Sequence, residues 1–169
     1  MANIVLITYA SKYGATQEIA EKVGEVLKKE GITVDVVPMK KVNKLADYQS
    51  VIIGSAVYIG QWYKPTTKFL QKNEKTLAAM PVWIFSSGPF GKGDPVELLK
   101  GWKFPLALKP MIDRINPREI VVFGGTMLPE KMSGMEKWIV KRVGGETGDF
   151  RDWEMINTWA KKVAKEIKK

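Results

Sequence analysis

The sequence predicts an α/β fold, a three-layer sandwich in which a five-stranded parallel sheet, ordered 2-1-3-4-5, lies between two layers of helices. Two observations lead to this prediction. Short apolar segments rich in β-branched residues alternate along the chain with segments whose apolar residues recur at helical spacing. The strand segments are apolar almost throughout, as strands covered on both faces are. This alternation is typical of parallel strands joined by right-handed crossovers.

The first half of the chain holds three of the predicted strands. Residues 3–9 form a near-continuous apolar run, which indicates a central strand. A helix follows from Thr16 until Gly31 stops it. Residues 33–37 and 51–55 are the second and third strands.

Prolines shape the predicted second half. Pro65 suits the first turn of the helix after the third strand. Pro105 and Pro110 interrupt a helical stretch over residues 96–115, so we expect two shorter helices or a kink there. The remaining strands are predicted at residues 82–86 and 119–123, and the remaining helices at residues 133–143 and 153–167.

Composition excludes several kinds of site. The 169 residues suit one domain, residues 1–169, and include neither Cys nor His. The chain therefore has no disulfide, thiolate metal site, cysteine nucleophile or imidazole base. We expect no metal site and no catalytic side chain, because difficult chemistry in such a chain falls to a cofactor.

The net charge of +9, from 27 Lys and Arg against 18 Asp and Glu, is compatible with several partners. An anionic ligand, an acidic protein, nucleic acid and an anionic membrane surface all remain open. No apolar run is long enough to span a membrane, and residues 1–4 lack the basic flank of a secretory signal. We therefore expect a cytoplasmic location.

Ligands of an open parallel sheet bind at the carboxyl ends of its strands, where the winding direction reverses between the first and third strands. The loop after the first strand, residues 10–16, places two hydroxyls and Gly14 at a helix start. Unpaired N–H groups and the helix dipole there favour a phosphate. The loop has neither a Walker ending nor a three-glycine dinucleotide fingerprint. An ordinary turn with Thr16 as N-cap is the alternative.

Two further loops belong to the same predicted edge. Residues 54–63 carry three aromatic residues and two glycines, which can offer aromatic faces and backbone amides to a planar ligand. The alternative is that these aromatic residues pack under the next helix. Residues 86–94 form a glycine-rich loop with one aromatic residue, which a plain turn would also explain.

The first loop, Ser11-x-x-Gly14-x-Thr16, resembles the flavodoxin signature that binds the phosphate of FMN, with Tyr13 where flavodoxins have a threonine. The resemblance implies a flavodoxin-like FMN-binding domain. In that reading the first loop holds the phosphate, and the other two loops contact the ring. The predicted FMN-binding residues are Ser11, Lys12, Tyr13, Gly14, Ala15, Thr16, Ser55, Ala56, Val57, Tyr58, Ile59, Trp62, Ser87, Gly88, Pro89, Phe90 and Gly91.

A closer resemblance, over nearly the whole chain, is to the flavodoxin-like protoporphyrinogen oxidases of the menaquinone-dependent type. It rests on Met80-Pro81, on Gly124 after the fifth strand, and on Gly144-Gly145-Glu146-Thr147 with Asp152-Trp153 downstream. The resemblance implies an FMN-dependent oxidoreductase of heme biosynthesis, which oxidises a porphyrinogen and passes electrons to a quinone or another acceptor. It also implies peripheral contact with the inner face of a quinone-bearing membrane.

Two alternatives are kept beside this interpretation. One is a quinone or flavin reductase that uses NAD(P)H, although the sequence has no recognisable second nucleotide site. The other is a flavodoxin-type electron carrier that docks on a redox partner protein and has no substrate. Charge argues against the carrier, because the three loops hold one acid, Asp94, against Lys12 and Lys92. We expect no nucleic-acid binding, since aromatic residues interleave with basic ones only at residues 62–64.

Overall fold

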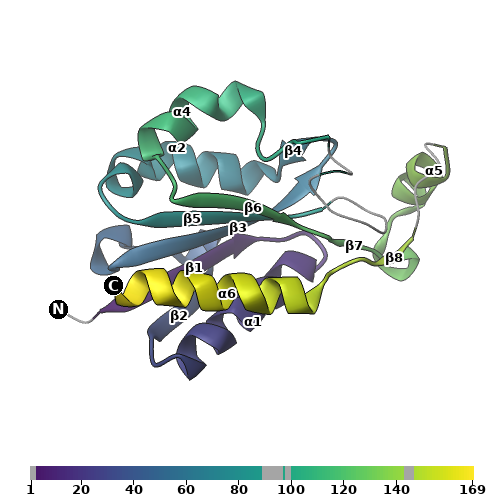
Figure 1. Ribbon diagram of the computed structural model, residues 1–169. Coiled ribbons are helices and arrows are strands. Elements are labelled where there is room, and N and C mark those ends of the chain that lie inside the picture. The colour runs from purple at the N-terminus through teal and green to yellow at the C-terminus, as the bar shows by residue number, and fades with distance from the viewer. Residues whose placement is uncertain (1–2, 89–96, 98–99, 143–146) are drawn as a thin grey trace.

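The computed structural model describes residues 3–88, 97, 100–142 and 147–169 and has a twisted parallel sheet at its centre (Figure 1). The long strands follow the spatial order β2-β1-β3-β5-β6, and every neighbouring pair among them is parallel. Numbered as the five strands of the prediction, this order is 2-1-3-4-5, so the predicted fold class is confirmed. The strands are β1 (Ile4–Ala10), β2 (Thr33–Pro38), β3 (Ser50–Tyr58), β5 (Val82–Ser87) and β6 (Glu119–Phe123).

Helices cover both faces of the sheet (Figure 1). One face carries α1 (Ala15–Lys29) and α6 (Trp153–Lys168), and the other carries α2 (Lys64–Ala78) and α4 (Lys109–Ile115). Side chains of one strand alternate between the two cores, because successive residues of a strand point to opposite faces. Short 3-10 helices occur at Met39–Lys41, Leu45–Asp47, Leu106–Leu108 and Pro129–Lys131.

The third strand is longer than predicted. It continues through residues 56–58, which the sequence placed in a loop, and then turns back as the short antiparallel strand β4 (Gln61–Trp62). Ile59 and Gly60 form the two-residue turn, with φ of 49° and 70°. Positive φ at both positions is typical of a hairpin turn that matches the twist of its strands. The second loop of the prediction is therefore mostly a β-hairpin.

The prolines of the predicted 96–115 helical stretch act at helix starts. Pro105 immediately precedes the 3-10 helix Leu106–Leu108, and Pro110 lies in the first turn of α4. A proline in the first turn removes no helical hydrogen bond, since the N–H groups of that turn have no partner in the helix. Residue 96 and residues 98–99 lie outside the described residues.

A small substructure leaves the sheet after β6 and holds one helix away from the sandwich (Figure 1). It comprises α5 (Gly134–Arg142) and a two-stranded antiparallel sheet of β7 (Thr126–Met127) and β8 (Gly148–Asp149). We call its described residues, 124–142 and 147–150, the α5 excursion. The prediction included α5 but not β7 and β8, because two-residue strands carry too short a pattern to be recognised.

The two ends of the excursion meet in a tight backbone contact. The Phe150 N–H donates a hydrogen bond to the Gly125 carbonyl at 2.9 Å. A Cβ atom on Gly124 would lie 2.0 Å from the Phe150 carbonyl oxygen, so only glycine fits there. Because Gly124 has no side chain, the segment that leaves the sheet can lie directly against the segment that returns at Phe150.

We call these two ends the neck of the excursion, and Arg151 links the neck to α1 and α6. Its guanidinium donates to the Asp149 carboxylate at 2.9 and 2.7 Å and also bonds Glu18 of α1. The guanidinium lies 4.7 Å from the centre of the Trp153 ring, at the start of α6. The side chain is 9% exposed, so it is largely enclosed by these partners.

We predict that Gly124→Ala destabilises the protein, because the new methyl group would clash with the backbone of Phe150. Unlike a side chain, this backbone cannot relieve the clash by changing rotamer. Overpacking of this kind typically costs about 1–3 kcal/mol. The change is measured as the free energy of unfolding in a urea titration followed by circular dichroism. Gly134→Ala is the matched control, because no heavy atom lies within 4 Å of its added Cβ. Equal stabilities of the two variants would contradict the tight neck.

Candidate functional site

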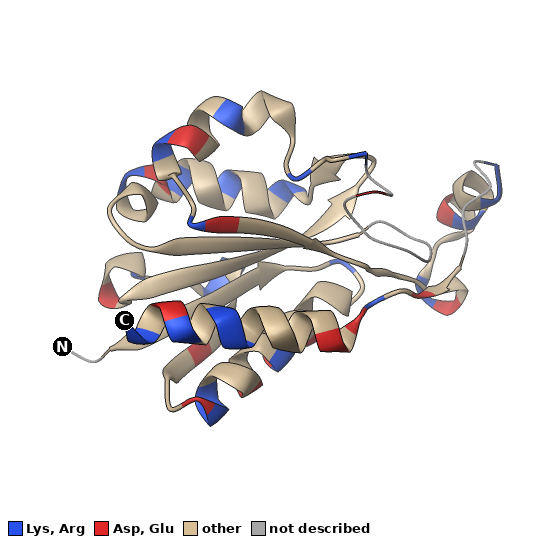
Figure 2. Ribbon diagram, viewed as in Figure 1, with Lys and Arg blue, Asp and Glu red and all other residues tan. Residues whose placement is uncertain are grey.

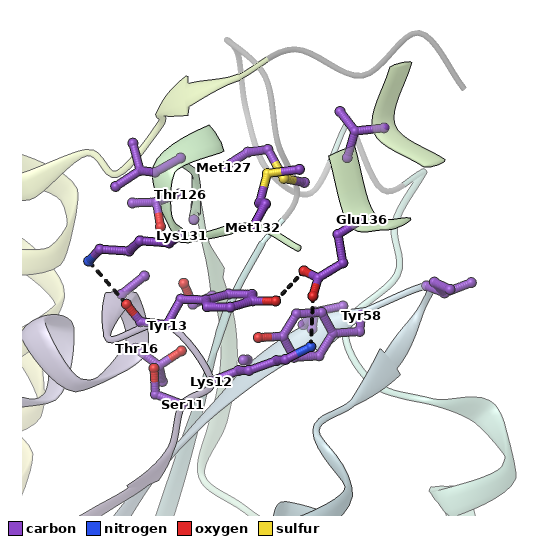
Figure 3. A pocket seen from close by; sticks show the side chains of 18 of the residues that line it. Ser11, Lys12, Tyr13, Thr16, Tyr58, Thr126, Met127, Lys131, Met132 and Glu136 are labelled. Atoms are coloured by element: carbon purple, nitrogen blue, oxygen red, sulfur yellow. Dashed lines mark hydrogen bonds and ion pairs between the residues drawn. The ribbon is translucent and has the colours of Figure 1, made fainter. Parts of the chain in front are cut away.

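A cleft of about 390 Å³ opens at the carboxyl edge of the sheet, between the first loop, the β3–β4 hairpin and the α5 excursion (Figure 3). This is the edge where the sequence predicted the ligand site. Its lining combines residues from both halves of the chain: Ser11, Lys12, Tyr13, Ala15, Thr16, Ala56, Val57, Tyr58, Ile59, Ser87, Gly125, Thr126, Met127, Leu128, Lys131, Met132, Glu136, Ile139 and Val140.

The first loop ends in a helix start without a side-chain cap. Gly14 occupies the cap position of α1 with φ of 93°, and no side chain there accepts from the first turn. Ser11 does not cap the helix, because its Oγ accepts a hydrogen bond from the Gly14 N–H at 2.9 Å. Thr16 is only 1% exposed but still lines the cleft. The first-turn N–H groups of α1 therefore remain available to an anion.

The end of β3 forms the second wall. Ala56, Val57 and Tyr58, three of the predicted FMN contacts, line the cleft, and they belong to a strand rather than to a loop. The Tyr58 ring meets the Tyr63 ring edge to face at 5.6 Å between centres. Burial raises the pKa of the Tyr58 phenol, so its hydroxyl stays protonated at neutral pH. This wall offers an aromatic surface and strand backbone to a ligand.

The third predicted loop is only partly described. Ser87 lines the cleft at the end of β5, and the following Gly88 has φ of 146° and an N–H that donates to the Phe123 carbonyl at 2.9 Å. Pro89, Phe90 and Gly91 lie outside the described residues, as do Gly144, Gly145 and Glu146.

Four of the described residues that were predicted to contact FMN do not line the cleft. Ser55 is fully buried, and its hydroxyl accepts from Thr66 at 2.7 Å and donates to the Ala56 carbonyl. Trp62 is 4% exposed and donates its indole N–H to Ser86 at 2.9 Å. The hairpin turns Trp62 back into the core beneath α2, so its ring is not available for stacking on a ligand. Gly14 and Gly88 are also absent from the lining.

The sequence analysis missed the opposite wall, which the α5 excursion supplies. Its members are mostly apolar: Gly125, Thr126, Met127, Leu128, Lys131, Met132, Glu136, Ile139 and Val140. One signal was available, since this segment follows the carboxyl end of β6 and must start at the ligand edge of the sheet. Its helix nevertheless looks like an ordinary amphipathic surface helix in sequence.

A polar cluster crosses the mouth between the two walls (Figure 3). The Glu136 carboxylate accepts from the Tyr13 hydroxyl and, at 3.1 Å, from the Lys12 ammonium. Lys131 donates to the Tyr13 carbonyl at 3.2 Å. These contacts hold α5 over the first loop, although 123 positions separate Tyr13 from Glu136 in the sequence.

The cluster shifts the pKa values of its own members. The hydrogen bond from Tyr13, supported by Lys12, holds the pKa of Glu136 below its ordinary 4.5. Burial and the same hydrogen bond raise the pKa of Tyr13, while contacts with Tyr13 and Glu136 raise that of Lys12. The carboxylate and the ammonium therefore both stay charged at neutral pH.

Comparisons with known proteins relate this chain to one family. A family model described as a flavodoxin domain matches residues 6–154. Protoporphyrinogen IX dehydrogenase (quinone) of Escherichia coli strain K12 is 24% identical over 174 residues, which cover 94% of this chain and 93% of that protein. At this level of identity the likeness does not by itself assign an activity.

Solved structures share the fold. A flavodoxin from the domain Archaea superposes with a TM-score of 0.64 at 14% identity, over 98% of this chain and 99% of that one. The rubredoxin oxygen:oxidoreductase of Desulfovibrio gigas superposes with a TM-score of 0.62 at 19% identity, over 99% of this chain but 36% of that one. Both likenesses concern the fold alone.

We predict that Tyr13→Phe raises the pKa of Glu136 toward its ordinary 4.5, because the variant removes the hydrogen bond that contributes most to the shift. A depressed carboxyl pKa stabilises the folded protein above the unfolded value, and this contribution fades as pH falls through the folded value. The stability difference between wild type and variant should therefore be largest near neutral pH and shrink below about pH 4.5. The measurement is an NMR titration of the Glu136 carboxyl carbon.

Tyr48→Phe is the control for this titration, because Tyr48 bonds Asp35 away from the cleft at 3.1 Å. It removes a similar phenol–carboxylate contact and should leave the Glu136 titration unchanged. An identical Glu136 titration in wild type and Tyr13→Phe would show that the cluster does not form.

Proposed function

This chain belongs to the flavodoxin domain family, and we propose that it is an FMN-dependent oxidoreductase that takes hydrogen from a reduced porphyrinogen and passes electrons to a quinone. Its general character as a flavodoxin-type redox protein with FMN as cofactor follows from the family. The porphyrinogen and the quinone are the finer part of the proposal. They are supported by relatives named protoporphyrinogen IX dehydrogenase (quinone), which align over 94% of this chain.

The cleft fits FMN in its polar requirements. The uncapped start of α1 presents N–H groups and the positive end of the helix dipole, and Thr16 adds a hydroxyl beside them. We assign the phosphate to this loop. Tyr58 and the end of β3 are proposed to contact the ring, since aromatic faces stack on planar ligands. Bound FMN supplies the transfer of hydrogen and electrons, a chemistry that no side chain of this chain offers.

The apolar α5 wall is the observation that carries the porphyrinogen assignment. Met127, Leu128 and Met132 face the first loop across the cleft. Lys131, on the same wall, provides positive charge at the mouth. A porphyrinogen is a large, mostly apolar molecule with carboxylate substituents. It therefore needs a site that combines an apolar surface with positive charge.

Individual side chains then have distinct roles. Lys131 is proposed to bind a substrate carboxylate, while its bond to the Tyr13 carbonyl keeps the ammonium at the mouth. The methionines exclude water and adapt to the substrate, because their side chains are flexible and apolar. Glu136 holds Lys12 and Tyr13 in place across the mouth.

We predict that Thr16→Val weakens FMN binding. The variant keeps the side chain's shape in its buried position but removes the hydroxyl assigned to the phosphate. A hydrogen bond to a charged group is worth about 1.5–3 kcal/mol, so Kd should rise roughly 10- to 100-fold. Kd is measured by quenching of FMN fluorescence during titration with protein.

Thr8→Val is the matched control for FMN binding. Thr8 is also fully buried, its hydroxyl has no hydrogen-bond partner among the described residues, and it does not line the cleft. Its removal should leave Kd unchanged. Equal Kd values for all three proteins would place the phosphate elsewhere.

The substrate assignment predicts that protoporphyrinogen bleaches the visible absorption of the FMN-loaded protein under anaerobic conditions and that a menaquinone analogue restores it. Lys131→Met should slow bleaching at limiting porphyrinogen by roughly two- to fivefold, as loss of an exposed ionic contact does. Lys44→Met is the control, since Lys44 lies outside the cleft. Bleaching by NAD(P)H alone would favour a quinone or flavin reductase. No bleaching by either reductant would favour an electron carrier.

A further inference from the structure

The mouth of the cleft carries an unusual share of the exposed apolar surface. Among the described residues, the large apolar side chains that face solvent are Ile59, Leu106, Met135, Trp138 and Ile139. Ile59 and Ile139 line the cleft, and Met135 and Trp138 belong to the same helix as Ile139. Only Leu106 lies elsewhere, in the 3-10 helix before α4. Exposed apolar side chains gathered beside a cleft point to an interaction site.

Ile59 has a backbone conformation that is unfavourable for isoleucine. It is the first turn residue of the β3–β4 hairpin, with φ of 49° and a side chain 95% exposed. Turn positions with positive φ favour glycine or asparagine, and a β-branched residue there is an outlier. Because the Ile59 side chain is exposed, it adds no buried apolar area to the fold. We attribute the isoleucine to a contact made outside the chain.

Helix α5 has no buried residue, and Figure 1 shows it standing apart from the sandwich. Glu136 and Val140 face the cleft. Met135 and Trp138 are 74% and 60% exposed and do not line the cleft. They are three positions apart and so share one side of the helix. The helix therefore presents an apolar side that no described part of the chain covers.

Positive charge accompanies this apolar side. No carboxylate of the described residues pairs with Lys137, Lys141 or Arg142. The Arg142 guanidinium lies 5.2 Å from the centre of the Trp138 ring. The one acidic residue of α5, Glu136, is engaged by Lys12 and Tyr13. The outer surface of α5 is consequently basic as well as apolar.

We propose that α5 and the β3–β4 turn form a docking surface for an anionic lipid bilayer. We call this surface the rim and define it as Ile59, Met135, Trp138, Lys137, Lys141 and Arg142. Tryptophan and aliphatic side chains enter the headgroup boundary, while lysine and arginine bind anionic headgroups. No described helix has the length and apolar character that crossing a bilayer requires, so the contact is with the surface.

A bilayer suits the rim better than a protein partner does. The apolar side chains stand on a nine-residue helix and on a two-residue turn, two separate projections beside the cleft. A protein would need a shape matched to both, whereas lipid headgroups rearrange around each. Docking of this kind directs the mouth toward the lipid phase, from which an apolar acceptor would enter. That last consequence rests on the proposed function, while the docking itself does not.

Vesicle sedimentation tests the rim with the full-length, FMN-loaded protein. Vesicles of phosphatidylcholine with a quarter phosphatidylglycerol should pellet the protein at 0.1 M salt, and pure phosphatidylcholine vesicles should not. The double variant Met135→Ser, Trp138→Ser and the double variant Lys137→Glu, Lys141→Glu should each lower the partition coefficient roughly tenfold or more. Circular dichroism verifies that each variant is folded.

Matched controls distinguish binding through the rim from nonspecific binding through any exposed apolar side chain or through net positive charge. Leu106→Ser removes an equally exposed apolar side chain away from the cleft, and Lys161→Glu with Lys165→Glu reverses two exposed charges on α6. Both should bind the anionic vesicles nearly as well as the wild type. A rim variant that binds like the wild type overturns the proposal.

Two other results would also overturn it. If the wild type ignores anionic vesicles but forms dimers in analytical ultracentrifugation that Trp138→Ser abolishes, a second copy covers the rim. If neither vesicles nor self-association involves the rim, the lipid assignment is wrong. Since vesicle binding is scored without turnover, failure of the porphyrinogen assay leaves this test unaffected.

Discussion

The cleft depends on one constraint of parallel sheets, which is that adjacent strands can send their connections to opposite faces. β1 and β3 are neighbours, yet β1 leads into α1 on one face and the chain after β3 leads into α2 on the other. The two connections must diverge at the carboxyl edge, and a ligand can enter between them. Because the strands are buried on both faces, this divergence is fixed by the two cores rather than by the loops themselves.

The α5 excursion turns this open crevice into an enclosed cleft, and its position depends on its neck. Gly124 allows the returning chain at Phe150 to pass, and Arg151 fixes that return to α1 through Glu18. At the far end, Glu136 reaches back to Tyr13. The excursion is thus held at both its base and its tip by residues of the sandwich, with a wall of flexible apolar side chains between them. Figure 2 marks basic and acidic residues along the ribbon of α5.

Local signals predicted most of the fold, and non-local contacts account for what was missed. The five long strands and the first loop were predicted, because apolar runs and helix starts are recognisable in short stretches of sequence. The end of the third strand was not, since β3 continues to Tyr58. Ser55 and Trp62 were assigned to the ligand because residues 54–63 were interpreted as a loop at the ligand edge. The alternative, in which the aromatic residues pack under the next helix, describes Trp62. The contact of Glu136 with Tyr13 joins residues far apart in sequence, which no local pattern encodes.

The cluster at the mouth also fixes how the cleft responds to pH. The pKa of Glu136 is lowered, while those of Tyr13 and Tyr58 are raised, so the carboxylate stays ionised and both phenols stay neutral around pH 7. The pKa of Lys12 is raised as well, which keeps its ammonium charged. With no histidine or cysteine in the chain, none of these four groups exchanges a proton in the physiological range. These four groups therefore keep the same charges across the physiological pH range, and the contacts among Lys12, Tyr13 and Glu136 persist with them.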